Sequence, residues 1–208
     1  MNQQAEAHRQ AGMEAFRAGD VDRALELFDQ ALKADPSYCE AYIARAAVHQ
    51  KRGQADKMIE ECERAIAVQP DHALAYSTRA VAYQMLGQHA RSLQDLTRAI
   101  ELEPRNFLQY AARAKTYIKM EAFDKAADDF QKAAQVELEV SKERGHPPRE
   151  AVALMLARVE MLRRAGKENE AQEVEREARE LEKAMSGKAG SGCGKAAAII
   201  LLFLWLAL

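Results

Sequence analysis

The sequence lacks the features that mark most enzymes and secreted proteins. Its three cysteines, Cys39, Cys62 and Cys193, form no CxxC pair, and its five histidines are not at metal-ligand spacing. It contains no glycine-rich phosphate loop and no Ser-His-Asp or Cys-His arrangement, and residues 1–10 lack the apolar core of a secretory signal. We therefore predict no enzymatic activity, no cofactor and no metal site, and we place the main part of the chain in the cytoplasm.

The sequence also has no large excess of charge of one sign, because it contains 30 basic and 32 acidic residues and has a net charge of −2. Such a balance provides no basic surface for a nucleic acid, so we predict no nucleic-acid partner. Aromatic residues make up only 6% of the chain, whereas alanine and leucine are frequent. This composition favours helices over sheets and predicts an all-α fold.

The sequence does contain an internal repeat. Pro36, Pro70 and Pro104 are each 34 residues apart, and each follows two runs of apolar residues at helical spacing. A Gly-X turn separates the two runs, as at Gly53 and Gly87. A fixed period of this length with two helices per unit predicts a stacked array, in which no unit can bury its apolar face alone.

Residues 73–106 carry a small residue at Ala80, an aromatic at Tyr83, Leu96 and Ala99 in the second run, and the closing Pro104. With these residues the chain resembles the tetratricopeptide repeat family. The resemblance implies an all-α fold, a right-handed superhelical solenoid of helix-turn-helix repeats, and it implies no enzymatic activity. The predicted segments are repeats at 1–38, 39–72, 73–106 and 107–148, a degenerate fifth repeat with capping helices at 149–185, a flexible linker at 186–195 and a hydrophobic tail at 196–208.

The fourth repeat departs from the pattern. Glu121 and Ala122 replace the turn glycine, and Leu138 replaces the closing proline, so we expect the second helix to continue until Gly145 and the prolines that follow it. The last helix before the linker has one narrow apolar stripe, which suits a capping helix. A short coiled-coil seam for self-association is the alternative, because the same spacing fits a heptad.

In three repeats the same place in the first helix carries an arginine and the same place in the second helix carries an acid. In repeat one these two places are held by the apolar residues Ala11 and Leu27, so the arginine and the acid are present or absent together. This pattern predicts ion pairs between packed helices, whereas the alternative is a row of arginines that reads acidic groups on a partner. The six residues are Arg45, Arg79 and Arg113 with Glu61, Asp95 and Asp129.

The resemblance also implies a concave groove, lined by the first helix of each repeat, that binds a peptide or helix of a partner protein. Of the family's basic clamp for acidic chaperone tails, only one place is matched here, by Arg9, and we expect no clamp. Leu74 and Leu108 could instead pack on the preceding repeat. The predicted groove residues are Arg9, Met13, Phe16, Ile43, Ala47, Gln50, Leu74, Ser77, Val81, Leu108, Ala111 and Lys115.

The last thirteen residues are uncharged and strongly apolar. As a helix they would reach about 20 Å, against a hydrocarbon core of about 30 Å, and Lys188 and Lys195 lie on the side of the repeats. We predict that this tail contacts membrane lipid through Ile199, Ile200, Leu201, Phe203, Leu204 and Trp205.

These features together predict a scaffold or adaptor that binds another protein in its groove and is tethered to a membrane by its tail, with cytoplasmic repeats. The alternative is a soluble, self-assembling scaffold whose tail packs on protein. A cleaved sorting signal would require an N-terminal secretion signal, which residues 1–10 do not provide. Homo-oligomerisation fits either of the first two interpretations.

Overall fold

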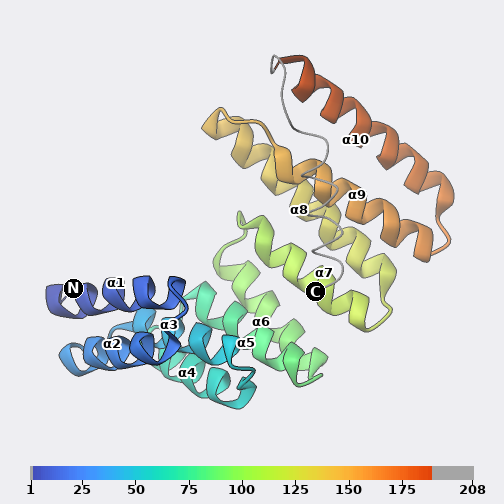
Figure 1. Ribbon diagram of the computed structural model, residues 1–208. Helices are drawn as coiled ribbons and strands as arrows, with labels where there is room; N and C mark the ends of the chain where they lie inside the picture. Colours follow the sequence, from blue (N-terminus) through green and yellow to red (C-terminus); the bar gives the residue numbers. More distant parts are fainter. Residues whose placement is uncertain (1, 189–208) are drawn as a thin grey trace. The chain divides into compact units, whose positions relative to one another are not determined.

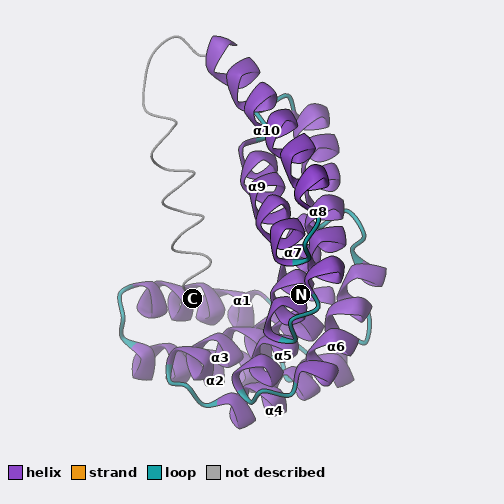
Figure 2. Cartoon of the chain, turned by 90° about the vertical axis from the view of Figure 1, so that its right-hand side faces the viewer, coloured by secondary structure: helices purple, strands orange, loops and turns teal. Residues whose placement is uncertain are grey.

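The computed structural model describes residues 2–188, and every regular element among them is a helix (Figures 1 and 2). The chain divides into two compact units, unit 1 at Met1–Glu103 and unit 2 at Pro104–Leu208. The predicted hydrophobic tail and residues 189–195 of the predicted linker lie outside the described residues. The helical repeat fold expected from the 34-residue period is confirmed.

Unit 1 consists of three helix pairs. In each pair the second helix packs on the first, and the first helices also contact one another in the order α1, α3, α5. The helices are α1 (Gln3–Arg17), α2 (Val21–Ala34), α3 (Cys39–Lys51), α4 (Ala55–Val68), α5 (Ala73–Met85) and α6 (His89–Leu102). The first helices thus form a continuous row along one side of the unit.

Small residues allow the helices of unit 1 to approach closely. A Cβ atom added at Gly12 would lie 2.5 Å from Cε1 of the fully buried Phe28, so α1 and α2 could not pack this way with a larger residue there. One and two repeats later, Ala46 and Ala80 occupy the same place and have no exposed surface. At the place of Phe28 the next two repeats carry the smaller Cys62 and Leu96, so the glycine occurs in the repeat whose second helix has the largest side chain there.

The closing prolines take part in a hydrogen bond that recurs at each repeat boundary. A tyrosine from the following first helix donates its hydroxyl hydrogen to the proline carbonyl oxygen. The three bonds are Tyr42 to Pro36 at 3.1 Å, Tyr76 to Pro70 at 3.0 Å and, in unit 2, Tyr110 to Pro104 at 3.2 Å. Each first helix is thereby attached to the chain segment that ends the repeat before it.

Unit 2 contains four helices of unequal length. These are α7 (Phe107–Lys119), α8 (Phe123–Arg144), α9 (Arg149–Arg164) and α10 (Glu168–Lys188). Helix α8 has 22 residues, against 14 in α4, and ends where Gly145 adopts a φ of 70°. Because no proline stops the helix earlier, its last two turns extend beyond the repeat and pack on α9.

The turn between α7 and α8 is made by an unusual residue. Glu121 adopts a φ of 56°, the left-handed conformation that Gly53 and Gly87 adopt in the corresponding turns of unit 1. The repeat therefore keeps its turn geometry although the glycine is missing, and Glu121 bears the steric cost of a side chain in this region.

Helix α10 covers one side of α9. Ala171, Val174 and Ala178 are buried, which is the narrow apolar stripe expected of a capping helix. The helix continues to Lys188, so the first three residues of the predicted linker are helical. In the described part of the chain, each helix is either too short or too polar to cross a bilayer.

Candidate functional site

The row of first helices in unit 1 presents a partly apolar surface. We call it the first-helix face and define it by its exposed and half-buried residues Met13, Phe16, Ala47, Gln50, Leu74, Ser77 and Val81. Leu74 has 51% of its surface exposed, whereas Val81 is half-buried against the cluster around Met58. Lys51 lies 5.3 Å from the centre of the Phe16 ring, which links α3 to α1 along this face.

Two predicted groove residues lie in the core instead. Ile43 is only 8% exposed and packs with Cys39, Ala65 and Ala75 between α3, α4 and α5. Ala111 of α7 is 5% exposed. Both side chains are therefore largely covered. The family pattern did not indicate this, because it gives the position along the helix but not how far each side chain is covered by the neighbouring helices.

Two further predicted groove residues, Leu108 and Lys115, are on α7 and therefore belong to unit 2. Leu108 is 62% exposed. Lys115 is half-buried, and this burial lowers the pKa of its ammonium group. Since the two units are described separately, these residues form no part of the first-helix face.

The structure brings together the arginine and aspartate of repeats three and four. Arg79 Nε and Nη2 each lie 2.8 Å from an oxygen of Asp95, and Arg113 contacts Asp129 in the same way at 2.9 and 2.8 Å. Both aspartates are buried. The hydrogen bonds to the carboxylates raise the pKa of both arginines, so these guanidinium groups are held by internal partners.

The pair in repeat two is looser. Arg45 Nη2 lies 3.2 Å from Glu61 Oε1, while Arg45 Nη1 lies 3.3 Å from Asp29 of α2. Arg45 Nε and Glu61 Oε2 are buried and have no hydrogen-bond partner. Burial raises the pKa of Glu61 despite the neighbouring arginines. Arg45 is thus shared between two acids, and Glu61 Oε1 also accepts a hydrogen bond of 3.1 Å from Arg64, in place of the single two-point contact that each aspartate makes.

Repeat five carries the arginine without the acid. Arg158 of α9 occupies the place of Arg113, and Val174 of α10 stands where the acid would be. The Nε atom of Arg158 is buried and has no hydrogen-bond partner. This arginine thus differs from the arginines of repeats two to four.

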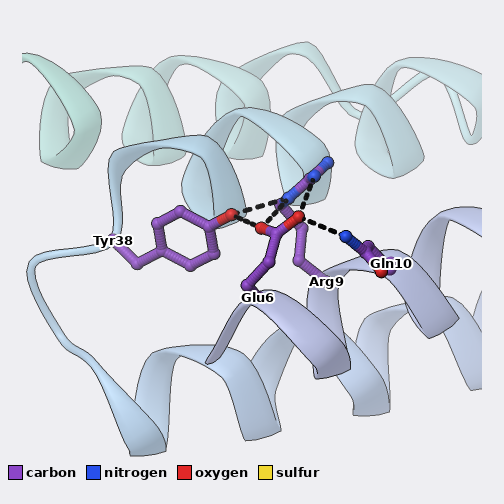
Figure 3. Close-up of polar contacts among 4 residues, drawn as sticks. All are labelled: Glu6, Arg9, Gln10 and Tyr38. Atoms are coloured by element: carbon purple, nitrogen blue, oxygen red, sulfur yellow. Dashed lines mark hydrogen bonds and ion pairs between the residues drawn. The ribbon is translucent and has the colours of Figure 1, made fainter. Parts of the chain in front are cut away.

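A polar cluster that the sequence did not reveal lies at the start of α1 (Figure 3). Arg9 donates from Nε and Nη2 to the carboxylate of Glu6, at 3.0 and 2.8 Å, and its Nε also lies 2.7 Å from the hydroxyl of Tyr38. Tyr38 and Gln10 donate to the same carboxylate. The contact from Glu6 to Tyr38 spans 32 residues, and no local pattern in the sequence indicates it.

The cluster shifts the ionisation of its members. The Arg9 and Tyr38 hydrogen bonds lower the pKa of Glu6 to about 2, and the same contact with Glu6 raises the pKa of Arg9. Burial, followed by the hydrogen bond to Glu6, raises the pKa of Tyr38 to about 12. Glu6 is therefore charged throughout the physiological pH range, and Arg9 already has a carboxylate partner.

Another buried carboxyl group with a raised pKa, that of Glu137, lies between α8 and α9. Glu137 is 2% exposed, and its Oε1 accepts a hydrogen bond of 2.6 Å from Ser141 Oγ, while its Oε2 has no partner. Burial raises the pKa of Glu137, the Ser141 bond opposes this shift, and Glu150 at the start of α9 adds to it. This carboxyl group contacts no basic side chain of the described residues through an ion pair.

The cysteine thiols and the potential metal ligands of the described residues are the remaining groups to consider as reactive or metal-binding. Cys39 and Cys62 are buried, and this burial raises the pKa of their thiols to about 11 and about 12, so they are poor nucleophiles at neutral pH. Across residues 2–188 no group of three His, Cys, Asp or Glu side chains is placed to hold a metal ion. Cys193 and the six predicted membrane residues lie outside the described residues.

The paired helices and the row of first helices define an α-helical repeat protein. Comparison of the sequence with family models gives two matches, both to the tetratricopeptide repeat, at residues 15–82 and 73–106. Residues 15–106 therefore consist of tetratricopeptide repeats. No curated protein matches the sequence.

Solved structures show the same fold over most of the chain. The MamA protein is 20% identical, with a TM-score of 0.72 over 93% of this chain and 100% of that one. The protein TTC0263 of Thermus thermophilus is 21% identical, with a TM-score of 0.65 over 98% and 100% of the two chains. The first tetratricopeptide repeat domain of Spaghetti (RPAP3), bound to the HSP90 peptide SRMEEVD, is 25% identical, with a TM-score of 0.55 over 58% and 95%.

Proposed function

We propose that this protein is a non-enzymatic scaffold that binds a segment of a partner protein on the first-helix face of unit 1. The main support is that Leu74 is exposed and that Val81, Met13 and Phe16 are half-buried on the row of first helices, where Arg45 and Arg79 are paired internally. Exposed apolar side chains that gather on one face are typical of a docking surface for another protein. The peptide bound to the related repeat domain supports the same class of function.

A capture experiment tests this proposal. We expect Leu74→Glu in the full chain to abolish partner capture, because a charged group would have to be buried against the partner. The matched control is Val68→Glu, which places the same charge on an exposed apolar residue of a second helix. Both variants should retain the helicity of the wild type. If Leu74→Glu captures the partner as well as Val68→Glu does, the first-helix face is not the docking surface.

We also propose that residues 196–208 tether the repeats to a membrane, with the repeats on the cytoplasmic side. The support is the composition of this segment, in which central leucine, isoleucine and phenylalanine residues each favour insertion by about 0.3–0.6 kcal/mol. Lys195 precedes the segment and can extend its ammonium group to the lipid headgroups.

Fractionation distinguishes a membrane tether from a tail that packs on protein. We expect the full chain to sediment with membranes and to resist carbonate extraction, and the chain truncated after Lys195 to be soluble, folded and monomeric. A soluble, oligomeric full chain would instead favour the self-assembling scaffold. Loss of repeat helicity on truncation would show that the tail belongs to the core.

A further inference from the structure

We propose that the Glu6 carboxylate competes with partner carboxylates for Arg9. The first-helix face therefore selects against partner segments that place a carboxylate beside α1. This inference names a specificity determinant of the proposed docking surface and therefore rests on the proposed function. It concerns the polar cluster of Figure 3, whose members are Glu6, Arg9, Gln10 and Tyr38.

The cluster lies at one end of the first-helix face. Glu6, Arg9, Met13 and Phe16 follow each other at spacings of three and four residues, which places them on one side of α1. Met13 and Phe16 pack against the cluster that includes Ala44 and Val48 of α3. A partner segment that covers the Met13 and Phe16 end of the face therefore also approaches Arg9.

The edge of the Arg9 guanidinium group formed by Nε and Nη2, which would make a two-point contact with a partner carboxylate, is already used. Its Nε and Nη2 form a two-point contact with the Glu6 carboxylate, and that carboxylate also accepts hydrogen bonds from Tyr38 and Gln10. A two-point contact of this kind is the strong form of an arginine–carboxylate interaction. A partner carboxylate would have to displace Glu6, which is attached to the same helix and fixed by a tyrosine that is itself buried.

Charge acts in the same direction. With Glu6 ionised, the net charge of the Glu6–Arg9 pair is zero, and an incoming carboxylate would meet the like charge of Glu6 beside the guanidinium group that attracts it. On the next two first helices, Arg45 is held by Glu61 and Asp29, and Arg79 is held by Asp95. The occupant that fits this face is therefore a segment with apolar docking side chains and no carboxylate opposite Arg9.

The next repeat provides an internal control. Glu40 lies 34 residues after Glu6, but Ile43 replaces the arginine, and Glu40 is exposed and forms no ion pair with any described residue. A Glu→Gln change therefore removes one negative charge at either site, and only at Glu6 does it release a guanidinium group.

The test uses the acidic peptide SRMEEVD, labelled with a fluorophore and titrated into the full chain by fluorescence anisotropy. We expect weak binding to the wild type and to Glu40→Gln, and binding tighter by about tenfold or more to Glu6→Gln, since a hydrogen bond to a charged group contributes at least this factor. The double variant Glu6→Gln with Arg9→Ala should return to the wild-type affinity. Glu6→Ala is the second variant, because the side-chain oxygen of glutamine can still accept a hydrogen bond from Arg9, whereas alanine cannot.

The proposal is overturned if both Glu6 variants bind the peptide no more tightly than Glu40→Gln does, or if the gain persists without Arg9. Circular dichroism of each variant establishes that it is folded before the titration is interpreted. Partner capture by the Leu74→Glu variant tests the docking surface independently. A gain at Glu6→Gln with unchanged capture by Leu74→Glu would therefore refute the proposed docking surface and leave the role of Glu6 intact.

Discussion

In unit 1 each turn between paired helices is made by a glycine with positive φ, whereas in unit 2 the turn between α7 and α8 is made by Glu121 in the same conformation. The next helix, α8, is eight residues longer than its counterparts and carries a buried carboxyl group, Glu137, in its second half. Both units nevertheless keep the two-point arginine–aspartate pair. The comparison shows that the helix-packing contacts are kept while the turns and helix lengths vary.

The largest predicted effect concerns the contact that both units share. Arg79→Ala should lower the free energy of unfolding by about 3 kcal/mol, because it leaves the buried Asp95 carboxylate without its partner. Arg113→Ala should have an equal effect through Asp129. Denaturant unfolding measures both values, and hydrogen exchange locates each loss in its own unit.

Repeat one provides the control for this prediction. Because Ala11 and Leu27 occupy the two places there, the double variant Arg79→Ala with Asp95→Leu should recover most of the lost stability. If the double variant is as unstable as Arg79→Ala alone, the unpaired Asp95 carboxylate is not the cause of the loss of stability.

Exchanging the turn residues should change the stability of the two units in opposite directions. Glu121→Gly should stabilise unit 2 by about 1 kcal/mol, because it removes a side chain from the left-handed region, and Gly87→Ala should destabilise unit 1 by a similar amount. Thermal unfolding measures both changes. No atom lies within 4 Å of a Cβ added at Gly87, so a loss there reports the backbone alone. A stabilised Gly87→Ala variant would contradict this account.

A smaller effect, below about 1 kcal/mol, is expected for Glu137→Gln, and it should depend on pH. The pKa of Glu137 is raised in the folded chain, so as the pH rises past 4.5 the unfolded chain ionises first and the folded state loses stability until Glu137 also ionises. The glutamine variant should therefore be more stable than the wild type at about pH 8 and equally stable at about pH 3. Urea unfolding at the two pH values measures the difference. A variant whose advantage is the same at both values would exclude ionisation as the cause.

The smallest effect is the opposite pH dependence in unit 1. The pKa of Glu6 is lowered to about 2, so its contribution to stability is complete above pH 4.5 and is lost as the pH falls toward 2. Glu6→Gln should therefore have a flatter stability profile than the wild type between about pH 5 and pH 2, and Glu40→Gln should not. Hydrogen exchange of α1 over this range provides the measurement. Parallel profiles of the wild type and Glu6→Gln would contradict the prediction.

Much of the fold could be predicted because it repeats. Pro36, Pro70 and Pro104 define the period, and the joint loss of charge at Ala11 and Leu27 indicates which arginines have acidic partners. Contacts that occur once could not be predicted this way. The bond from Tyr38 to Glu6 has no counterpart in the next repeat, and the burial of Ile43 depends on how closely α4 and α5 approach it.

The hydrogen bonds from tyrosines to the closing prolines also have a consequence for synthesis on the ribosome. Because Tyr42 and Tyr76 each belong to the helix after the proline they contact, a repeat is completed only when the next first helix has emerged. At about 5–20 residues per second, a 34-residue repeat takes about 2–7 s to make, whereas a helix forms in about a microsecond. We therefore expect the array of unit 1 to form from its N-terminus one repeat at a time during synthesis, with each new first helix adding the tyrosine that bonds to the repeat before it.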